Sequence, residues 1–437
     1  MRKNTKLALI LSAAAMLTLG ASFSAFAASG WLNQNGEWRY LDRDGYAVTD
    51  EWKKSGNDWY YINSDGYMAK NALINDGKNY YAVEQSGKMV TNQWSYLEDD
   101  GDFYWFYFQS NGKAKDNGFL TVDGQKYHFT DCKMDEGWLQ DENNTYLLDK
   151  EHNGTYGAVK TGWVYVDDFD DDDDVSADEE GWYYFETTGK MVTNDEKKIN
   201  EHYYVFDENG LMLDNWVEFT SAPAATISNA ASSDSIYKYY TPGVGNRVNG
   251  WKWLEECGKD EGKETEEGWY YFKNGIPYTS EYKTTKIADG YSVAKINSKI
   301  YCFNKNGLMV TGKVDGENGK YYYFGEDEND GSMKYGKVKI TDSDDLDEGT
   351  YYFDDKGSLG DKGGSVTGVV KGYLYNNGEL VTAEDGMRYE IANVDGKDYM
   401  VSESGKVKTS GTVTDGDDTK WRITKDESGN YVITKVN

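Results

Sequence analysis

Ring-rich and polar segments alternate along the chain with a period of 21 residues. Three kinds of position keep this spacing through the first hundred residues: an opening residue, the first ring of an aromatic cluster, and a glycine. They are Trp31, Trp52, Leu73 and Trp94; Trp38, Trp59 and Tyr80; and Gly45, Gly66 and Gly87. Self-similarity at a fixed period is the signature of a repeat architecture, so chain length alone does not set the number of domains.

Each repeat unit is predicted to be a β-hairpin. Turn pairs such as Asn35-Gly36 supply the positive φ angles that two-residue hairpin turns need, and clusters such as Trp59-Tyr60-Tyr61 favour extended strands. A single hairpin is marginally stable, but stacked hairpins bury each other's rings. The predicted fold is therefore all-β: a β-solenoid of stacked, aromatic-rich hairpin repeats of about 21 residues.

The same pattern continues to the C-terminus with drifting spacing. Further aromatic clusters occupy residues 127–129, 182–185, 203–204, 269–272, 301–303, 321–324, 351–353 and 373–375. Three parts are predicted: repeats with an acidic loop insertion over 28–216, an irregular Ser/Ala-rich insertion over 217–249, and degenerate repeats over 250–437. The repeats leave too little chain for a separate catalytic domain.

The first 27 residues are predicted to be a secretory signal peptide. Arg2, Lys3 and Lys6 precede an apolar stretch from Leu7 to Leu19, and Ala25-Phe26-Ala27 forms a small-residue cleavage site. The apolar stretch is shorter than the roughly 20 residues that a membrane-spanning helix needs. We expect a secreted protein at the cell surface or in the cell wall, with no membrane partner after cleavage.

Composition narrows the possible partners. The formal net charge of -30 repels phosphate backbones, so nucleic acid is not expected to bind. Aromatic residues make up 15% of the chain, and 48 Gly accompany only 3 Pro. Charged disordered chains are poor in aromatic residues, so this composition favours folded structure.

Residues with catalytic or metal-binding potential are scattered. His128, His152 and His202 show no zinc-ligand spacing, and no glycine-rich phosphate loop or nucleophile elbow stands out. We expect no enzymatic activity, no cofactor and no metal site. The run Asp170–Asp174 could bind calcium, but it lacks EF-hand spacing, and a solvated, self-repelling loop is the preferred interpretation. Three widely separated cysteines are expected to be incidental: Cys132, Cys257 and Cys302.

The N-terminal repeats resemble a known family. The pattern Gly30-Trp31, Trp38-Arg39-Tyr40, then Trp52 and Trp59-Tyr60-Tyr61, resembles the choline-binding, or cell wall-binding, repeats of Gram-positive surface proteins. That resemblance implies stacked hairpins whose rings bind the choline groups of teichoic acids. Later clusters such as Tyr351-Tyr352-Phe353 resemble the related glucan-binding repeats of glucosyltransferases and clostridial toxins.

The resemblance also implies which rings hold a ligand. A family cage takes the opening Trp and the first cluster ring from one unit, and the third cluster ring from the next unit. Carried over, this rule gives Trp31, Trp38 and Tyr61 as a complete cage, and the next unit gives Trp52 and Trp59 with Ala82 in place of the third ring. Further sets of rings lie at Trp94, Trp105 and Phe129, and at Trp251, Trp269 and Phe303.

Three functions remain open from the sequence. The leading hypothesis is a secreted, non-catalytic cell wall-binding protein that attaches non-covalently to choline-bearing wall polymers through these aromatic cages. A neutral polysaccharide, such as a glucan, is the alternative ligand, since a sugar also stacks on aromatic rings. The third hypothesis is a structural or adhesive surface spacer whose rings serve only as hairpin core.

Overall fold

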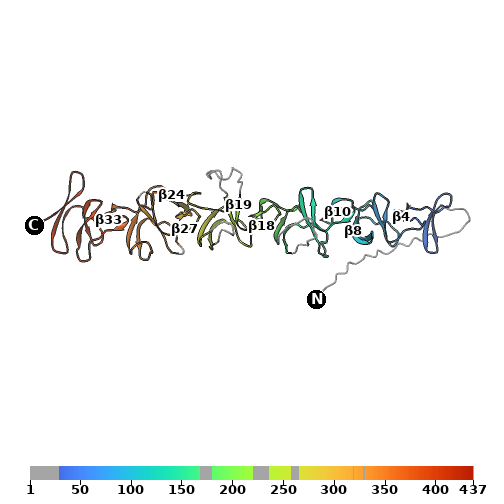
Figure 1. Cartoon of the computed structure of the whole chain (residues 1–437), viewed down its shortest axis with the longest axis horizontal. Helices are drawn as coiled ribbons and strands as arrows, with labels where there is room; N and C mark the ends of the chain where they lie inside the picture. The colour runs from blue at the N-terminus through green and yellow to red at the C-terminus, as the bar shows by residue number, and fades with distance from the viewer. Residues whose placement is uncertain are drawn as a thin grey trace, which may run out of the picture. The chain divides into compact units, whose positions relative to one another are not determined.

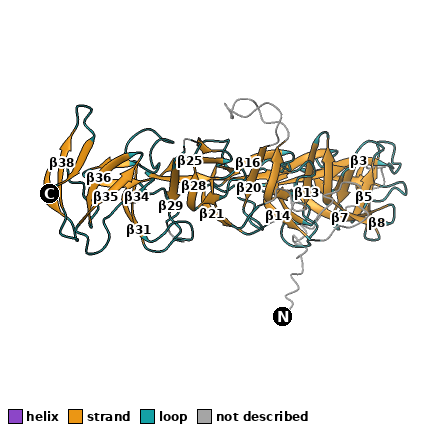
Figure 2. Cartoon of the chain, turned by 60° about the vertical axis from the view of Figure 1, so that its left-hand side comes forward, coloured by secondary structure: helices purple, strands orange, loops and turns teal. Residues whose placement is uncertain are grey.

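The computed structural model describes residues 29–167, 180–219, 236–256, 265–317, 319–327 and 330–436. Across these residues the chain forms β-strands, turns and loops and no α-helix, which confirms the all-β prediction (Figures 1 and 2). No apolar helix able to span a membrane is therefore found in the described part of the chain. The predicted signal peptide and the run Asp170–Asp174 lie outside the described residues.

The chain divides into two units. Unit 1 comprises residues up to Asn194 together with Phe206–Leu211, and unit 2 comprises Asp195–Val205 and Met212–Asn437. The strands up to residue 185 are β1 Gly30–Gln34, β2 Glu37–Leu41, β3 Glu51–Ser55, β4 Asp58–Ile62, β5 Ala72–Asn75, β6 Tyr80–Val83, β7 Gln93–Asp99, β8 Asp102–Phe108, β9 Gly118–Val122, β10 Gln125–Thr130, β11 Lys133–Met134, β12 Gly137–Asp141, β13 Asn144–Leu148, β14 Gly162–Val166 and β15 Gly181–Phe185.

The remaining strands begin at residue 195. They are β16 Asp195–Ile199, β17 His202–Phe206, β18 Met212–Leu213, β19 Asn215–Phe219, β20 Ile236–Tyr240, β21 Gly250–Leu254, β22 Gly268–Lys273, β23 Ile276–Pro277, β24 Thr285–Ala288, β25 Tyr291–Ile296, β26 Lys299–Phe303, β27 Met309–Val310, β28 Gly312–Asp315, β29 Tyr321–Phe324, β30 Gly336–Ile340, β31 Gly349–Phe353, β32 Gly368–Val370, β33 Tyr373–Asn376, β34 Glu379–Leu380, β35 Tyr389–Val394, β36 Lys397–Ser402, β37 Gly411–Thr414, β38 Lys420–Lys425 and β39 Tyr431–Lys435.

The strands pair antiparallel in sheets of two to five strands, and the two-stranded hairpin of β3 and β4 shows the design. Trp52 lies opposite Tyr61, and Lys54 lies opposite Trp59. Because directly opposed residues of an antiparallel pair point to the same side, these residues share one face, which we call the tryptophan face. Tyr60 and Ile62 point to the other face, which we call the buried face.

The buried face supplies the core. The last residue of the second strand, Ile62 in β4, has no exposed surface, and the equivalent residues of later hairpins are also buried: Val83, Phe108, Phe129, Leu148, Phe185, Tyr240, Phe272, Phe303, Phe324 and Phe353. Burying such side chains contributes roughly 1.5–3 kcal/mol each, so these residues stabilise hairpins that would be marginal alone.

Backbone hydrogen bonds couple neighbouring hairpins within each unit. The amide of Met68 donates to the carbonyl of Trp38 at 2.8 Å, and the amide of Met89 donates to the carbonyl of Trp59 at 2.9 Å. In unit 2 the amide of Arg247 makes the same bond to Tyr203 at 2.8 Å. At these hairpins the loop after the second strand therefore pairs with the preceding hairpin. The β-solenoid arrangement of these couplings stays a prediction.

The sequence interruption after residue 217 lies partly inside a hairpin. Strands β19 and β20 pair in continuous register from Asn215 opposite Tyr240 to Phe219 opposite Ile236, on either side of residues 220–235, which lie outside the described part.

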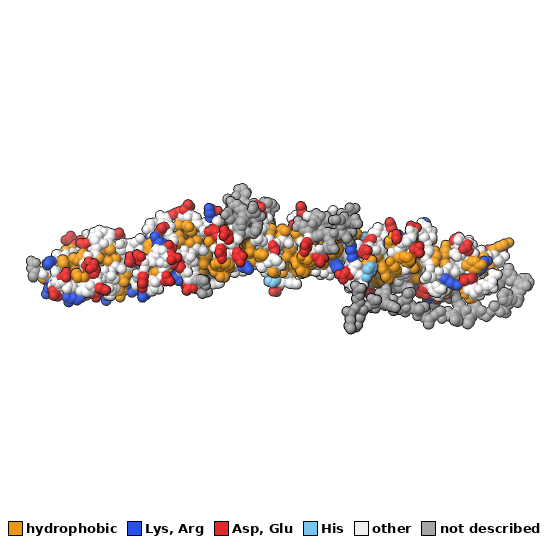
Figure 3. All heavy atoms as spheres, turned by 60° about the horizontal axis from the view of Figure 1, so that its bottom comes forward, with side chains coloured by type: hydrophobic (Ala, Val, Ile, Leu, Met, Phe, Trp, Pro, Cys, Tyr) orange, Lys and Arg blue, Asp and Glu red, His pale blue; other side chains and the backbone are white. Residues whose placement is uncertain are grey.

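The described acidic side chains are spread over the visible surface among exposed hydrophobic ones (Figure 3).

Candidate ligand-binding interfaces between hairpins

The first hairpin interface brings four aromatic side chains together around Trp31. The Trp31 ring lies edge-on to Trp38 at a centroid distance of 6.5 Å and to Tyr40 at 5.4 Å, all three on the tryptophan face of the β1–β2 hairpin. Tyr60 from the buried face of the next hairpin lies 5.4 Å away. Trp31, Trp38 and Tyr40 are each partly exposed, so this face can reach a ligand.

The same contact recurs at other interfaces. An opening aromatic residue lies 4.7–6.1 Å from the ring at the second cluster position of the next hairpin, the position that Tyr60 has in its own, in each of these pairs: Trp52 and Tyr81, Trp94 and Tyr127, Phe119 and Tyr146, Trp138 and Tyr183, and Trp251 and Tyr301. The interface thus joins the tryptophan face of one hairpin to the buried face of the following one.

Tyr61 was predicted to complete the first cage with Trp31 and Trp38, and this prediction is wrong. Tyr61 packs on Trp52 of its own hairpin at 5.2 Å, and Tyr60 faces Trp31 instead. The physical reason is the two-residue alternation of a strand, which puts the third cluster ring on the same side as its own opening Trp. The same alternation turns Tyr81, and not Ala82, towards Trp52. The second interface therefore has a ring from the next hairpin although residue 82 is an alanine.

The later predicted sets are assembled in part. Trp94 lies 6.4 Å from Trp105 and stacks on Phe129 at 5.7 Å, and Trp251 stacks on Phe303 at 6.0 Å. Phe129 and Phe303 have no exposed surface, so they act as core and cannot line an open cage. Trp269 lies against Trp253 at 5.6 Å. Of the first-ring residues, Trp59 is the most open in the N-terminal hairpins, with 39% of its surface exposed.

Several ring contacts were not predicted from the sequence. Trp163 lies 6.3 Å from Trp182, with the same near-perpendicular geometry as Trp31 with Trp38 and Trp94 with Trp105. The acidic insertion lengthens the spacing between Trp163 and Trp182, so the 21-residue period does not predict this pair. The signal that could have revealed it is the Gly-Trp dipeptide that begins β14 and again begins β15.

One interface already holds an ammonium group. Lys126 stands where other hairpins carry the first ring, and its Nζ lies 3.8 Å from the centroid of Phe119 and 4.9 Å from that of Tyr146. It also donates to the carbonyl of Thr188 at 2.9 Å. Burial, with a smaller contribution from the charge of Lys190, holds the pKa of Lys126 below its ordinary value. An opening ring and the next hairpin's second ring therefore accept a cation between them.

Tyr60 and Tyr61 remain neutral at physiological pH. Burial, with a smaller effect of Asp58, raises the pKa of Tyr60 above 10.0. Burial and Asp50 do the same for Tyr61. Tyr60 consequently offers an uncharged π face at the first interface.

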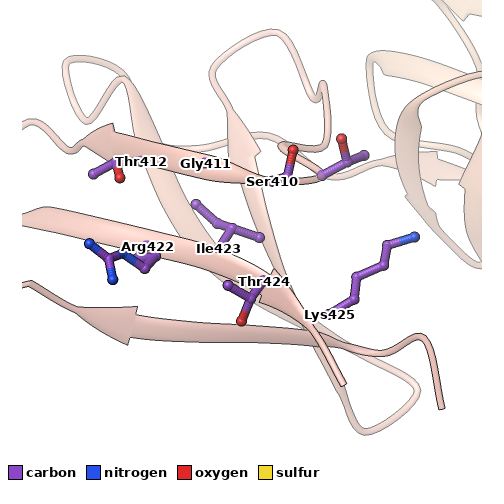
Figure 4. Close-up of a pocket in the computed structure, with 8 residues that line it drawn as sticks. Ser410, Gly411, Thr412, Arg422, Ile423, Thr424 and Lys425 are labelled. Carbon is purple, nitrogen blue, oxygen red and sulfur yellow. The ribbon is translucent and has the colours of Figure 1, made fainter. Parts of the chain in front are cut away.

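Two hollows on the described surface are lined mainly by side chains other than these rings. A shallow depression of about 650 Å³ between β37 and β38 is lined by Ser, Thr, Ile, Arg and Lys side chains (Figure 4). Another, of about 440 Å³, includes a single ring, Tyr67, which Arg39 already covers at 3.9 Å. Within the described residues, no group of three or more His, Cys, Asp and Glu side chains could hold a metal ion. Cys132 and Cys302 are buried free thiols.

Comparison with known proteins identifies related repeats. Residues 48–94 match the choline-binding repeat, and residues 29–47 and 177–191 match the putative cell wall binding repeat. Glucosyltransferase-I of Streptococcus downei is 25% identical over 295 residues, which cover 61% of this chain and 16% of that much longer protein. These matches confirm the resemblance to choline-binding repeats and to a glucosyltransferase.

Two solved structures from Streptococcus pneumoniae illustrate the structural likeness. The modular autolysin LytC is 20% identical, with a TM-score of 0.39, over 64% of this chain and 52% of that chain. Choline binding protein F is 21% identical, with a TM-score of 0.24, over 80% of this chain and 98% of that chain.

Proposed function

Because residues 29–47 and 48–94 match cell wall-binding and choline-binding repeats, we propose that the protein is a secreted, non-catalytic cell wall-binding protein. It attaches non-covalently to choline-bearing wall polymers at the hairpin interfaces. The ligand group is the quaternary ammonium of choline, which has no hydrogen-bond donor on nitrogen and is recognised by π faces.

The observation that carries this proposal is the position of Lys126. Its ammonium lies between Phe119 and Tyr146. At the interface of Trp31 and Tyr60, the ring of Trp38 occupies the position that corresponds to Lys126. A lysine that leaves bulk water to lie between these two rings is an internal analogue of a cationic ligand. The corresponding cage is Trp31, Trp38 and Tyr40, with Tyr60 as its floor.

Charge and valency agree with a cationic, polymeric ligand. At a net charge of -30 the chain repels a bare polyanionic polymer, whereas choline groups present positive charge to it. Weak sites on one chain raise the avidity for a polymer by roughly 10² to 10⁴ when several are engaged together. Several modest cages are therefore sufficient for attachment to the wall.

Sedimentation with isolated cell walls tests the proposal. The mature chain is expected to sediment with walls that carry choline and to be released by free choline chloride, but not by ethanolamine at equal concentration. Walls from cells grown so that ethanolamine replaces choline are the matched control and should not retain the protein. Retention that free choline leaves unchanged would contradict the choline assignment.

Neutral polysaccharide binding is the second candidate. It is favoured by exposed rings on three hairpins, and the similarity to a glucosyltransferase is consistent with it. Release from walls by a neutral glucan, and not by choline, would support this function. A structural spacer would respond to neither.

A further inference from the structure

Methionine side chains join consecutive hairpins at seven places in the described part of the chain. At each place a thioether fills the space beside a glycine in the loop after the second strand of the next hairpin. A Cβ added to that glycine would lie 2.8 Å or less from the Met Sδ. We call each such pair a methionine joint; the pairs are Met68 and Gly87, Met89 and Gly112, Met134 and Gly157, Met191 and Gly210, Met212 and Gly245, Met309 and Gly331, and Met333 and Gly363.

One methionine holds three hairpins together, as Met89 shows. Its amide donates to the carbonyl of Trp59, in the preceding hairpin, at 2.9 Å. It also forms an antiparallel bridge with Val83, the last residue of its own hairpin. Its side chain packs beside Gly112, in the loop of the following hairpin. A poorer fit of this side chain therefore disturbs three consecutive hairpins.

The joint needs an apolar side chain but not a sulfur atom. Leu380 fills the equivalent space beside Gly405, and Val159 fills it beside Gly189. Yet seven of the nine methionines in the described residues stand in such joints, the exceptions being Met387 and Met400. What methionine adds to leucine or valine is a thioether that an oxidant converts into a polar sulfoxide.

Most of the joint methionines can be reached from solvent. Met68 and Met333 are buried, with 6% and 3% of their surface exposed. The other five are partly exposed: Met89, Met134, Met191, Met212 and Met309. Susceptibility to oxidation follows exposure, so these five are the accessible sites.

A sulfoxide does not fit the joint. The Sδ lies where even one added carbon on the glycine would clash, and a sulfoxide is larger than a thioether and needs a hydrogen-bond donor. The oxidised side chain must displace the glycine loop or withdraw from it to reach water. Either movement separates the methionine from the next hairpin.

We propose that the partly exposed methionine joints are oxidative modification sites whose co-substrate is a small peroxide such as hydrogen peroxide. The Sδ lone pair attacks one peroxide oxygen, the O–O bond breaks, and the leaving hydroxide takes the proton of the transferred oxygen and departs as water. Sulfur is oxidised by two electrons and the peroxide is reduced by two. Oxidation uncouples neighbouring hairpins, and methionine sulfoxide reductases reverse it. The proposal depends on the joints and not on choline binding.

Peroxide treatment of the full mature chain tests the proposal, with peptide mass spectrometry and hydrogen exchange as readouts. Met89 and the other partly exposed joint methionines should gain one oxygen before Met68, Met333 and Met400 do. Amides on both sides of an oxidised joint should exchange about tenfold faster, because a buried acceptor without a partner favours local opening. The two sulfoxide reductases, one for each epimer, should restore slow exchange.

Met89→Leu assigns the effect to one joint, and Leu380 shows that leucine fits this place. In this variant, peroxide should no longer accelerate exchange around Gly112 but should still do so around Gly157. Met387→Leu changes a partly exposed methionine outside the joints and should respond like the wild type. Met134→Leu, with the two loops exchanged in the expected result, takes over should Met89→Leu fail to fold.

Three outcomes would overturn the proposal. Joint methionines that stay reduced while Met387 is oxidised would show that peroxide does not reach them. Oxidised joints that exchange no faster than untreated ones would show that the sulfoxide is accommodated. Equal acceleration around Gly112 in the wild type and in Met89→Leu would show that the thioether of Met89 is not the site.

Discussion

Trp31 packs edge-on against Tyr60 of the following hairpin, with ring centroids 5.4 Å apart and planes inclined at 76°. Tyr61, one residue further on, turns to the other side of its strand and contacts Trp52. The same one-residue distinction holds where Trp52 meets Tyr81 and where Trp94 meets Tyr127. It places a candidate cation site between an opening aromatic residue and the second ring of the next cluster.

Removing the first ring should disable one cage. Trp38→Ala takes away the ring that lies 6.5 Å from Trp31 and is expected to weaken choline binding at that interface about tenfold, since one ring contributes on the order of 1–2 kcal/mol. Isothermal titration calorimetry of the mature chain should then count one fewer choline per molecule. Trp38→Phe is the matched control that keeps a ring. An unchanged count in a folded variant would remove this cage from the account.

Replacing the internal ammonium should create a cage. Lys126→Trp withdraws the cation from between Phe119 and Tyr146 and restores the ring that other hairpins have at this position. The number of choline molecules bound should rise by one in the same titration. Lys126→Arg, which retains a cation, should leave the number unchanged. A Trp variant that binds no more choline than the wild type would show that Lys126 does not mark a cation site.

Replacing a turn glycine should destabilise the fold through backbone strain and, at some positions, also through a clash with the preceding hairpin. Gly87 has a φ of 81°, and a Cβ there would lie 2.6 Å from Cε of Met68 and 3.1 Å from the carbonyl oxygen of Ala69. Gly77 has a φ of 85° but open space around it. Gly77→Ala should cost about 1–2 kcal/mol from backbone strain alone.

Gly87→Ala should cost more than Gly77→Ala, because it also displaces Met68 of the preceding hairpin. Hydrogen exchange measured by mass spectrometry should show faster exchange in both hairpins for Gly87→Ala. Gly77→Ala should accelerate exchange mainly around its own turn. Equal effects of the two variants would mean that the glycine contact with Met68 does not couple the hairpins.

The network around Glu196 should make unit 2 sensitive to acid. Its carboxylate accepts hydrogen bonds from Tyr240 at 2.6 Å, Arg247 at 2.8 Å and Lys238 at 2.9 Å. Burial alone would raise the pKa of Glu196, but these bonds and the charge of Lys238 hold it below its ordinary value of 4.5. A lowered folded-state pKa adds stability above pH 4.5, and that stability is lost as the pH falls through the folded-state pKa.

Glu196→Gln should therefore be less stable than the wild type at neutral pH, with the difference shrinking below pH 4.5. Hydrogen exchange of residues 236–256 as a function of pH measures this locally. Glu218→Gln, an exposed substitution on the neighbouring strand β19, is the control. A wild-type segment whose protection does not fall below pH 4.5 would show that the ionised carboxylate is not what stabilises it.

Strand and turn positions could be predicted from the sequence wherever a local signal exists. Asn35 and Gly36 do adopt positive φ angles, 57° and 91°, at the turn between β1 and β2. The pairing of Trp31 with Tyr40 follows directly from that two-residue turn. Such features depend on neighbouring residues alone.

The partner ring across an interface could not be fixed in the same way. Whether Tyr60 or Tyr61 faces Trp31 depends on which side of one hairpin packs on the next, and the 21-residue period is compatible with either. The burial of Phe129 and Phe303 also depends on packing between hairpins, because Trp94 and Trp251 of the preceding hairpins stack on these rings. Lys126 could not be predicted from the ring pattern, because a cation stands where the repeat carries a ring.

Calorimetric titration of choline chloride into the mature full-length chain tests the central claim most directly. Contacts with three or four rings predict saturable binding at several sites, with dissociation constants on the order of 1 mM. Betaine, which pairs the same quaternary ammonium with a carboxylate, should bind more weakly to this acidic chain. Saturable heat from several choline equivalents per chain is the expected result, and a folded protein that takes up no choline would contradict the claim.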